Sequence, residues 1–117
     1  MGNKARNAHD SHCRDFSMHP KRYLGNIDGL LLTTDETNII DEKGIIKTQP
    51  DFLIFSIKDH TIYHGEYKSH SSISADNHAL RQLKIRQVYL TEAFSNTKYD
   101  RIVGLYVHDN NEINIIR

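Results

Sequence analysis

The sequence predicts an α/β domain with a central mixed β-sheet flanked by helices. From residue 29 to residue 70, short apolar runs alternate with turn signals, a pattern typical of β-strands. Residues 79–94 then run without glycine or proline, which indicates one long helix. Two further apolar runs, at residues 101–107 and 113–116, complete the order of strands, one helix and two strands.

Each predicted element has a local reason. The first strands are expected as an antiparallel meander within four apolar runs, at residues 30–34, 38–40, 45–57 and 61–70. The helix is expected from about Asp76 to Phe94, because Ser74 or Asp76 can cap its first turn. The last two runs flank residues 108–112, which predicts a hairpin with an Asn-Asn turn.

The length of 117 residues fits one domain with a modest core, which we place at residues 23–117. Residues 1–22 are polar, and only Phe16 and Met18 are obvious core material there. This segment is expected to form a loose arm or a short helix.

Charge and cysteine content limit the possible classes of function. The 15 Lys and Arg residues balance 15 Asp and Glu residues, so any nucleic-acid binding must come from local patches. The single cysteine, Cys13, cannot form an internal disulfide, and no early segment is apolar enough for a signal peptide or a spanning helix. We therefore expect a soluble cytoplasmic protein that does not bind membranes.

Three charged residues are predicted to meet on one hairpin. Side chains alternate across a strand, so Glu66 and Lys68 lie on the same face. Pro50 is tolerated at the first position of a strand, which puts Asp51 at the start of the preceding strand. If the two strands pair, Asp51 lies beside Glu66 and Lys68, within metal-site distance.

Two adjacent carboxylates repel each other unless a cation lies between them. Mg²⁺ prefers carboxylate oxygens together with waters and substrate phosphate oxygens. A bound ion can activate water and stabilise a departing alkoxide, while a neighbouring ammonium orients the nucleophile or shields phosphate charge. The cluster therefore predicts metal-assisted phosphoryl chemistry.

At these residues the chain resembles the PD-(D/E)XK nuclease superfamily, whose motif is matched by Pro50-Asp51 and Glu66-Tyr67-Lys68. The resemblance covers roughly residues 29 to 108 and implies a restriction-endonuclease-like core. It also implies Mg²⁺-dependent hydrolysis of DNA phosphodiesters, with Mn²⁺ able to substitute. Asp51 and Glu66 would be the metal ligands, and Lys68 would stand beside the attacking water.

The predicted helix carries an amide within its apolar stripe, which consists of Leu80, Leu83, Leu90 and Phe94. In several branches of the superfamily a Gln on this helix faces the active site, and Gln87, or Gln82 on a different face, could take that catalytic role here. Alternatively, Gln87 lies at the rim of the stripe and binds loop backbone.

One feature of the superfamily has no clear counterpart. Many members, including archaeal Holliday-junction resolvases, have a further acidic ligand on an N-terminal helix, and here no Glu precedes Glu36. Asp10, Asp15 or Asp28 could substitute, although the segment around Asp28 is equally a turn.

Simpler interpretations compete with these assignments. Glu66 and Lys68 could form an ion pair on a solvated strand, and the Pro-Asp pair could be a turn. His9, His12 and Cys13 are ligand-type residues, but without a second pair at a recognisable spacing they do not predict a zinc site.

Other polar residues have two interpretations. His64 and His70 share a face with Glu66, where contact with solvent is favoured over contact with phosphate. Basic residues of the helix could line a nucleic-acid-binding surface or simply form its wet face; they are Arg81, Lys84 and Arg86.

The preferred hypothesis is a small Mg²⁺-dependent, structure-selective DNA endonuclease, acting as a homodimer whose twofold symmetry suits two strands. The alternative is a non-catalytic nucleic-acid-binding or assembly protein on the same scaffold. An RNA nuclease would differ only in its substrate.

Overall fold

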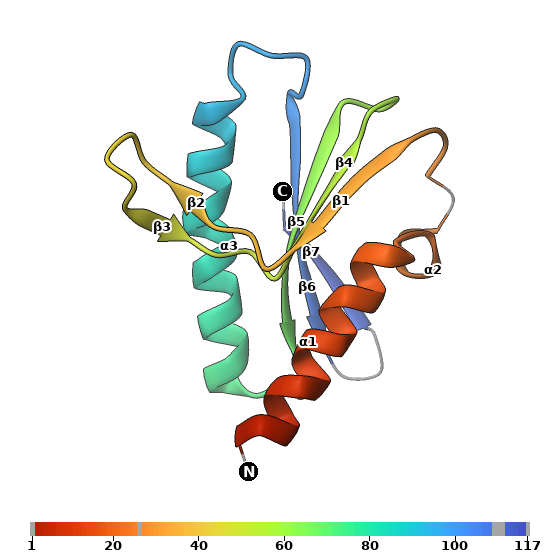
Figure 1. The fold of residues 1–117 in the computed structure, drawn as a ribbon, viewed down its shortest axis with the longest axis vertical. Coiled ribbons are helices and arrows are strands. Elements are labelled where there is room, and N and C mark those ends of the chain that lie inside the picture. The colour runs from red at the N-terminus through yellow and green to blue at the C-terminus, as the bar shows by residue number, and fades with distance from the viewer. Residues whose placement is uncertain (1, 26, 109–111, 117) are drawn as a thin grey trace.

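The computed structural model of the protein describes residues 2–25, 27–108 and 112–116. It has three layers, with helices on both faces of a central sheet (Figure 1). The elements in chain order are α1 (Gly2–Met18), α2 (Lys21–Leu24), β1 (Leu31–Asp35), β2 (Ile39–Ile40), β3 (Ile46–Thr48), β4 (Phe52–Ser56), β5 (Thr61–Lys68), α3 (Ile73–Ala93), β6 (Arg101–His108) and β7 (Glu112–Ile116).

The central sheet is mixed, which confirms the predicted α/β class. Within the described residues it has five strands in the order β1-β4-β5-β6-β7, of which only β5 and β6 run parallel to each other. Parallel neighbours need a crossover, which α3 provides. β2 and β3, which lie between β1 and β4 along the chain, form a separate two-stranded sheet. β6 and β7 pair as the predicted hairpin, but the proposed Asn-Asn turn at residues 109–111 lies outside the described residues.

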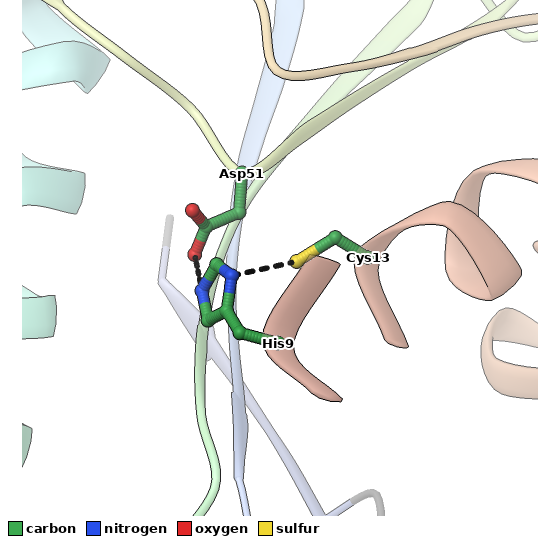
Figure 2. A group of neighbouring side chains, drawn as sticks. All are labelled: His9, Cys13 and Asp51. Atoms are coloured by element: carbon green, nitrogen blue, oxygen red, sulfur yellow. Dashed lines mark hydrogen bonds and ion pairs between the residues drawn. The ribbon is translucent and has the colours of Figure 1, made fainter. Parts of the chain in front are cut away.

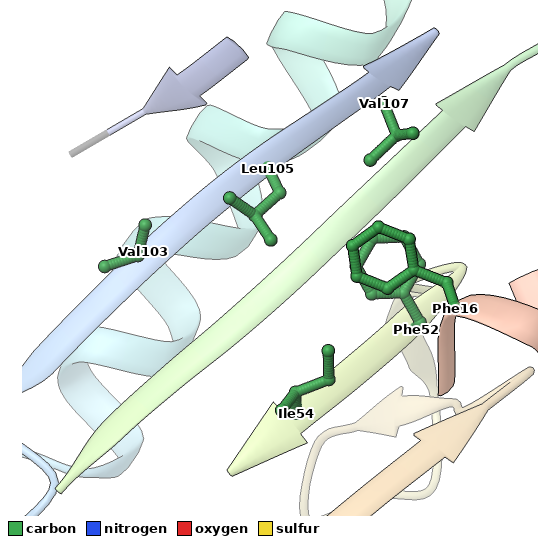
Figure 3. Packing of buried hydrophobic residues seen from close by; sticks show 6 residues of the cluster. All are labelled: Phe16, Phe52, Ile54, Val103, Leu105 and Val107. Atoms are coloured by element: carbon green, nitrogen blue, oxygen red, sulfur yellow. The ribbon is translucent and has the colours of Figure 1, made fainter. Parts of the chain in front are cut away.

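Alternation along the strands divides the core between the two faces of the sheet. One face packs against Phe16 of α1, and the aromatic rings of Phe16 and Phe52 stack with their centroids 4.1 Å apart. Figure 3 shows this cluster, which consists of Phe16, Phe52, Ile54, Val103, Leu105 and Val107. On the other face, Leu53, Ile62 and Ile102 of the sheet pack against Leu90 of α3. Asp51 contacts α1 through His9 (Figure 2), and Glu66 contacts α3 through Arg86.

The long helix α3 begins at Ile73, three residues before the predicted Asp76. The reason is its cap: the Ser72 hydroxyl accepts a hydrogen bond from the backbone N–H of Ala75 at 3.0 Å. Leu83 and Leu90 of the predicted stripe are buried. Leu80 and Phe94 are half-buried, so the stripe does pack inward.

The N-terminal segment forms α1, a helix of 17 residues, which is longer than the short helix that its composition suggested. Phe16 and Cys13 are buried, and Phe16 packs against the sheet. Met18, expected as core material, is instead 68% exposed, because Phe16 and the buried Ser17 take the inward positions at the end of the helix. Within the described parts of the chain, no helix combines the length and the apolar character that crossing a membrane requires.

Candidate functional site

Asp51 and Glu66 are brought together by the pairing of β4 with β5. The register places Phe52 opposite Gly65, and the backbone N–H of Asp51 donates to the Gly65 carbonyl at 3.0 Å. Asp51 is therefore directly across from Glu66, as the hairpin interpretation predicted. The Asp51 carboxylate is held in place because its Oδ2 accepts the backbone N–H of Tyr67 at 2.7 Å.

The Glu66 carboxylate is buried against a guanidinium. Arg86 Nη2 donates to Glu66 Oε2 at 3.1 Å, and neither side chain is more than 8% exposed. Arg86 also donates to the Thr48 hydroxyl at 3.0 Å and to the Gly65 carbonyl at 3.4 Å. This single side chain therefore links α3 to β3 and to β5.

Burial raises the pKa of Glu66 to about 7, and the neighbouring negative charge of Asp51 acts in the same direction. Arg86 and Lys68 oppose this shift without cancelling it. Lys68 is half-buried two residues further along the same strand, on the face of Glu66. Near neutral pH the site thus holds a carboxyl group whose charged form a cation would stabilise.

A second group gathers on the other side of Asp51. His9 Nε2 lies 3.3 Å from Asp51 Oδ2, and Cys13 Sγ lies 3.9 Å from His9 Nδ1 (Figure 2). The hydrogen bond to Asp51 raises the pKa of His9 to about 11, whereas burial raises the pKa of the Cys13 thiol. His9 is therefore an imidazolium near neutral pH and supplies a positive charge to Asp51.

The three candidates for a further acidic residue lie in different places. Asp10 is next to the Asp51 group, with Oδ1 3.5 Å from His9 Nδ1. Asp15 binds the Tyr23 hydroxyl and Arg22, and Asp28 pairs with Lys58. Only Asp10 of these three shares a contact with the candidate site.

Gln87 is half-buried and uses both ends of its amide within the sheet–helix layer. Its Oε1 lies 2.7 Å from His64 Nε2, and its Nε2 donates to the Ile102 carbonyl at 2.8 Å. The interpretation that Gln87 binds loop backbone at the rim of the stripe was therefore partly right. One partner is a backbone carbonyl, but it belongs to strand β6 and not to a loop. The other candidate, Gln82, lines a cleft of about 380 Å³ together with Glu66.

His64 differs from what the sequence suggested. Contact with solvent was favoured, but His64 is fully buried, and burial lowers its pKa to about 4. It is therefore neutral and forms part of the layer under α3. His70 is exposed, as that interpretation required.

The basic residues of α3 separate into two groups. Arg81 and Lys84 are exposed. Arg86 is fully buried and bound to Glu66, so its assignment to a phosphate-binding surface was wrong. A charge on a helix usually indicates its solvent-exposed face. Here partners distant in sequence, Glu66, Thr48 and the Gly65 carbonyl, make the burial of Arg86 possible.

Sequence reasoning missed the involvement of α1. A signal was present, because His9 and Cys13 are four residues apart and so lie on one face of a helix. The aromatic layer between this helix and β5 was also missed: Tyr67 stacks on His12 with the ring centroids 3.9 Å apart. Neither pattern specifies its partner strand from sequence alone.

Comparison of the chain with models of protein families, with curated proteins and with solved structures found no match. The interpretation of the site therefore depends on its own residues. Two carboxylates, an ammonium and a nearby imidazolium can bind a cation, hold a phosphate oxygen and orient water.

Proposed function

We propose that the protein is a Mg²⁺-dependent deoxyribonuclease, similar to the PD-(D/E)XK superfamily and with a restriction-endonuclease-like core. The observation that carries this proposal is the placement of Asp51 directly across from Glu66, with Lys68 further along the same strand. A structural ion pair would need only one carboxylate. A second carboxylate beside it raises the electrostatic cost, because Asp51 acts with burial to raise the pKa of Glu66. A bound cation would lower this cost further than the existing partners His9 and Arg86 do.

The donor set fits a hard divalent cation. Asp51 and Glu66 offer carboxylate oxygens, and the remaining positions suit water and phosphate oxygens. Arg86 holds Glu66 through Oε2, and the Tyr67 N–H holds Asp51 through Oδ2, so both ligands are oriented before binding. When bound, Mg²⁺ would activate a water and stabilise charge on the transferred phosphoryl group.

The surrounding residues then have distinct tasks. The Lys68 ammonium offers a donor to the attacking water or to a phosphate oxygen, since an ammonium is no ligand for a cation. Gln87 acts as a positioning residue, because it fixes His64 and the β6 backbone beneath α3. Gln82, in the cleft that Glu66 lines, is the better placed amide for contact with substrate.

The substrate assignment extends the same proposal. DNA would contact exposed Arg81 and Lys84, whose charges a phosphate backbone attracts even though the protein is neutral overall. A homodimer would present two sites related by a twofold axis, which suits an endonuclease that recognises a DNA structure with two strands to cut.

The test measures cleavage of linear, nicked, flapped and four-way DNA with and without Mg²⁺. Asp51→Asn and Glu66→Gln should abolish Mg²⁺-dependent cleavage and retain DNA binding, because the amides remove ligand charge that also repels phosphate. Matched controls are Asp28→Asn and Glu42→Gln, both at exposed positions, which should cleave like the wild type. Full activity of Asp51→Asn would refute the proposed ligand.

A non-catalytic nucleic-acid-binding protein on this scaffold is the second candidate. One observation favours it: both carboxylates already have a positive partner, since His9 contacts Asp51 and Arg86 contacts Glu66. In that case DNA binding would be independent of Mg²⁺, and none of the four DNA forms would be cut.

A further inference from the structure

We propose that His9, Cys13 and Asp51 form a binding site for Zn²⁺ that is distinct from the Mg²⁺ site in two of its three ligands. One ligand atom from each residue lies within 4.8 Å of the other two (Figure 2). The donors are a ring nitrogen, a sulfur and a carboxylate oxygen, which are the three donor types that zinc accepts in proteins.

The backbone already provides most of the required arrangement. His9 and Cys13 are four residues apart on α1, a spacing that places two side chains on one face of a helix, as in helical zinc motifs. Asp51, the residue directly before β4, contacts His9 from the opposite side and is fixed by the Tyr67 N–H. The further ligand that the sequence did not show beside His9 and Cys13 is thus supplied by a residue distant in the chain.

The donor chemistry selects zinc over magnesium at this position. Mg²⁺ favours oxygen ligands only, whereas thiolate and imidazole favour Zn²⁺. Binding would form Zn–S, Zn–N and Zn–O bonds and release one proton from the Cys13 thiol and one from the His9 imidazolium. Thiolate and carboxylate together balance the charge of the ion.

The site is accessible and needs only a small adjustment. His9, Asp10, Cys13 and Asp51 line one cleft of about 290 Å³, which gives an ion and a fourth, water ligand room to enter. Zinc bonds of about 2.0–2.3 Å place ligand atoms roughly 3.5 Å apart, so the side chains must close by about 1 Å. Asp10 Oδ1, 3.5 Å from His9 Nδ1, can orient the imidazole as a carboxylate partner.

Sharing Asp51 gives the site a consequence for activity, and this part rests on the proposed function. A carboxylate that is bound to zinc together with His9 and Cys13 is drawn toward α1 and away from Glu66. Zn²⁺ should therefore inhibit Mg²⁺-dependent cleavage, and a chelator should restore it.

Binding is tested on the chelator-treated full chain, without reference to cleavage. Zn²⁺ is titrated in competition with a chromophoric chelator, and Co²⁺ is used as a spectroscopic probe. We expect one Zn²⁺ per chain and a thiolate-to-Co²⁺ charge-transfer band. His9→Gln, Cys13→Ser and Asp51→Asn should each weaken Zn²⁺ binding by roughly 100-fold. His19→Gln, at an exposed histidine after the same helix, is the control and should bind like the wild type.

Because Cys13 is buried, circular dichroism and thermal unfolding of the variants establish that each is folded, and Cys13→Ala repeats the test. His9→Gln, whose position is half-exposed, provides a folded variant in any case. Absence of the charge-transfer band, or unchanged Zn²⁺ affinity in His9→Gln, would overturn the proposal.

The cleavage arm separates the two proposals. Zinc binding without any Mg²⁺-dependent cleavage would leave the zinc site standing and remove the nuclease function. Cleavage that Zn²⁺ inhibits equally in the wild type and in Cys13→Ser would support the nuclease function and refute the zinc site as the cause of inhibition.

Discussion

Arg86 Nη2 donates to Glu66 Oε2 at 3.1 Å in a place where the arginine side chain has no exposed surface. The guanidinium thus gives one carboxylate of the candidate site a permanent partner. It also removes a positive charge from the outer face of α3. The pair connects the chemistry of the site to the stability of the fold.

Removal of the guanidinium should destabilise the protein strongly. Arg86→Met keeps much of the side-chain volume but leaves Glu66 buried without its counter-charge and leaves the Thr48 hydroxyl unpaired. Breaking a buried pair in this way costs about 3–5 kcal/mol. Urea unfolding at neutral pH measures this loss in the free energy of unfolding. Arg81→Met, at an exposed position of the same helix, should change the free energy of unfolding by about 0.5 kcal/mol or less.

Glu66 should make stability fall as the pH rises. Its pKa is about 7 in the folded protein and 4.5 as the ordinary value, so between these values the folded state binds more protons than the unfolded state. The free energy of unfolding should therefore lose on the order of 3 kcal/mol from this group between about pH 4.5 and 7. His64, whose pKa falls to about 4, acts in the opposite direction between pH 4 and 6.5.

The two contributions are separated by a variant. The difference in unfolding free energy between the wild type and Glu66→Gln isolates the Glu66 titration, because His64 is common to both. As the pH rises from 4.5 to 7.5, the unfolding free energy of the wild type should fall relative to that of Glu66→Gln. A constant difference across this range would show that the pKa of Glu66 is not raised.

Lys68 should affect turnover more than metal affinity. If the proposed nuclease function holds, Lys68→Ala removes a donor to the attacking water or phosphate and leaves the two proposed ligands, Asp51 and Glu66, in place, so kcat should fall on the order of 100-fold. The Mg²⁺ concentration for half-maximal cleavage should stay the same. Lys58→Ala, at an exposed lysine, is the control. A change in Mg²⁺ dependence without a change in kcat would contradict the assigned role.

Gly65 should tolerate no side chain while Phe52 is present. A Cβ at Gly65 would lie 1.9 Å from Phe52 Cζ, so Gly65→Ala must displace an aromatic ring from the core. Overpacking of this kind costs roughly 1–3 kcal/mol. A double-mutant cycle with Phe52→Leu, followed by urea unfolding, should show favourable coupling, since the smaller side chain relieves the contact. Additive effects would indicate that the ring moves away freely.

Local pattern was sufficient for some elements and insufficient for others. The β4–β5 hairpin follows from alternation and from Pro50, both of which are local. α3 follows from an uninterrupted helical stretch, and only its first residues were missed. α1 has few apolar residues, and the packing of Phe16 on Phe52 makes it part of the core. That contact joins segments far apart in sequence, which no local pattern indicates.

The same distinction applies to the site. Asp51 and Glu66 could be paired from the sequence because a single turn separates their strands. The burial of Arg86 could not be predicted, since its favourable partners belong to β3 and β5. The approach of His9 to Asp51 likewise depends on how α1 docks on the sheet.

The parallel pairing of β5 with β6 has a consequence for the order of folding. The β4–β5 hairpin closes through a short turn, a step that takes microseconds in typical hairpins. β6 can join β5 only after residues 69–100 have formed the crossover, and such non-local pairing is slower. We therefore expect Asp51 and Glu66 to become neighbours during refolding before β6 joins the sheet. Divalent ions in the refolding buffer would then meet the paired carboxylates of Asp51 and Glu66 before the central sheet is complete.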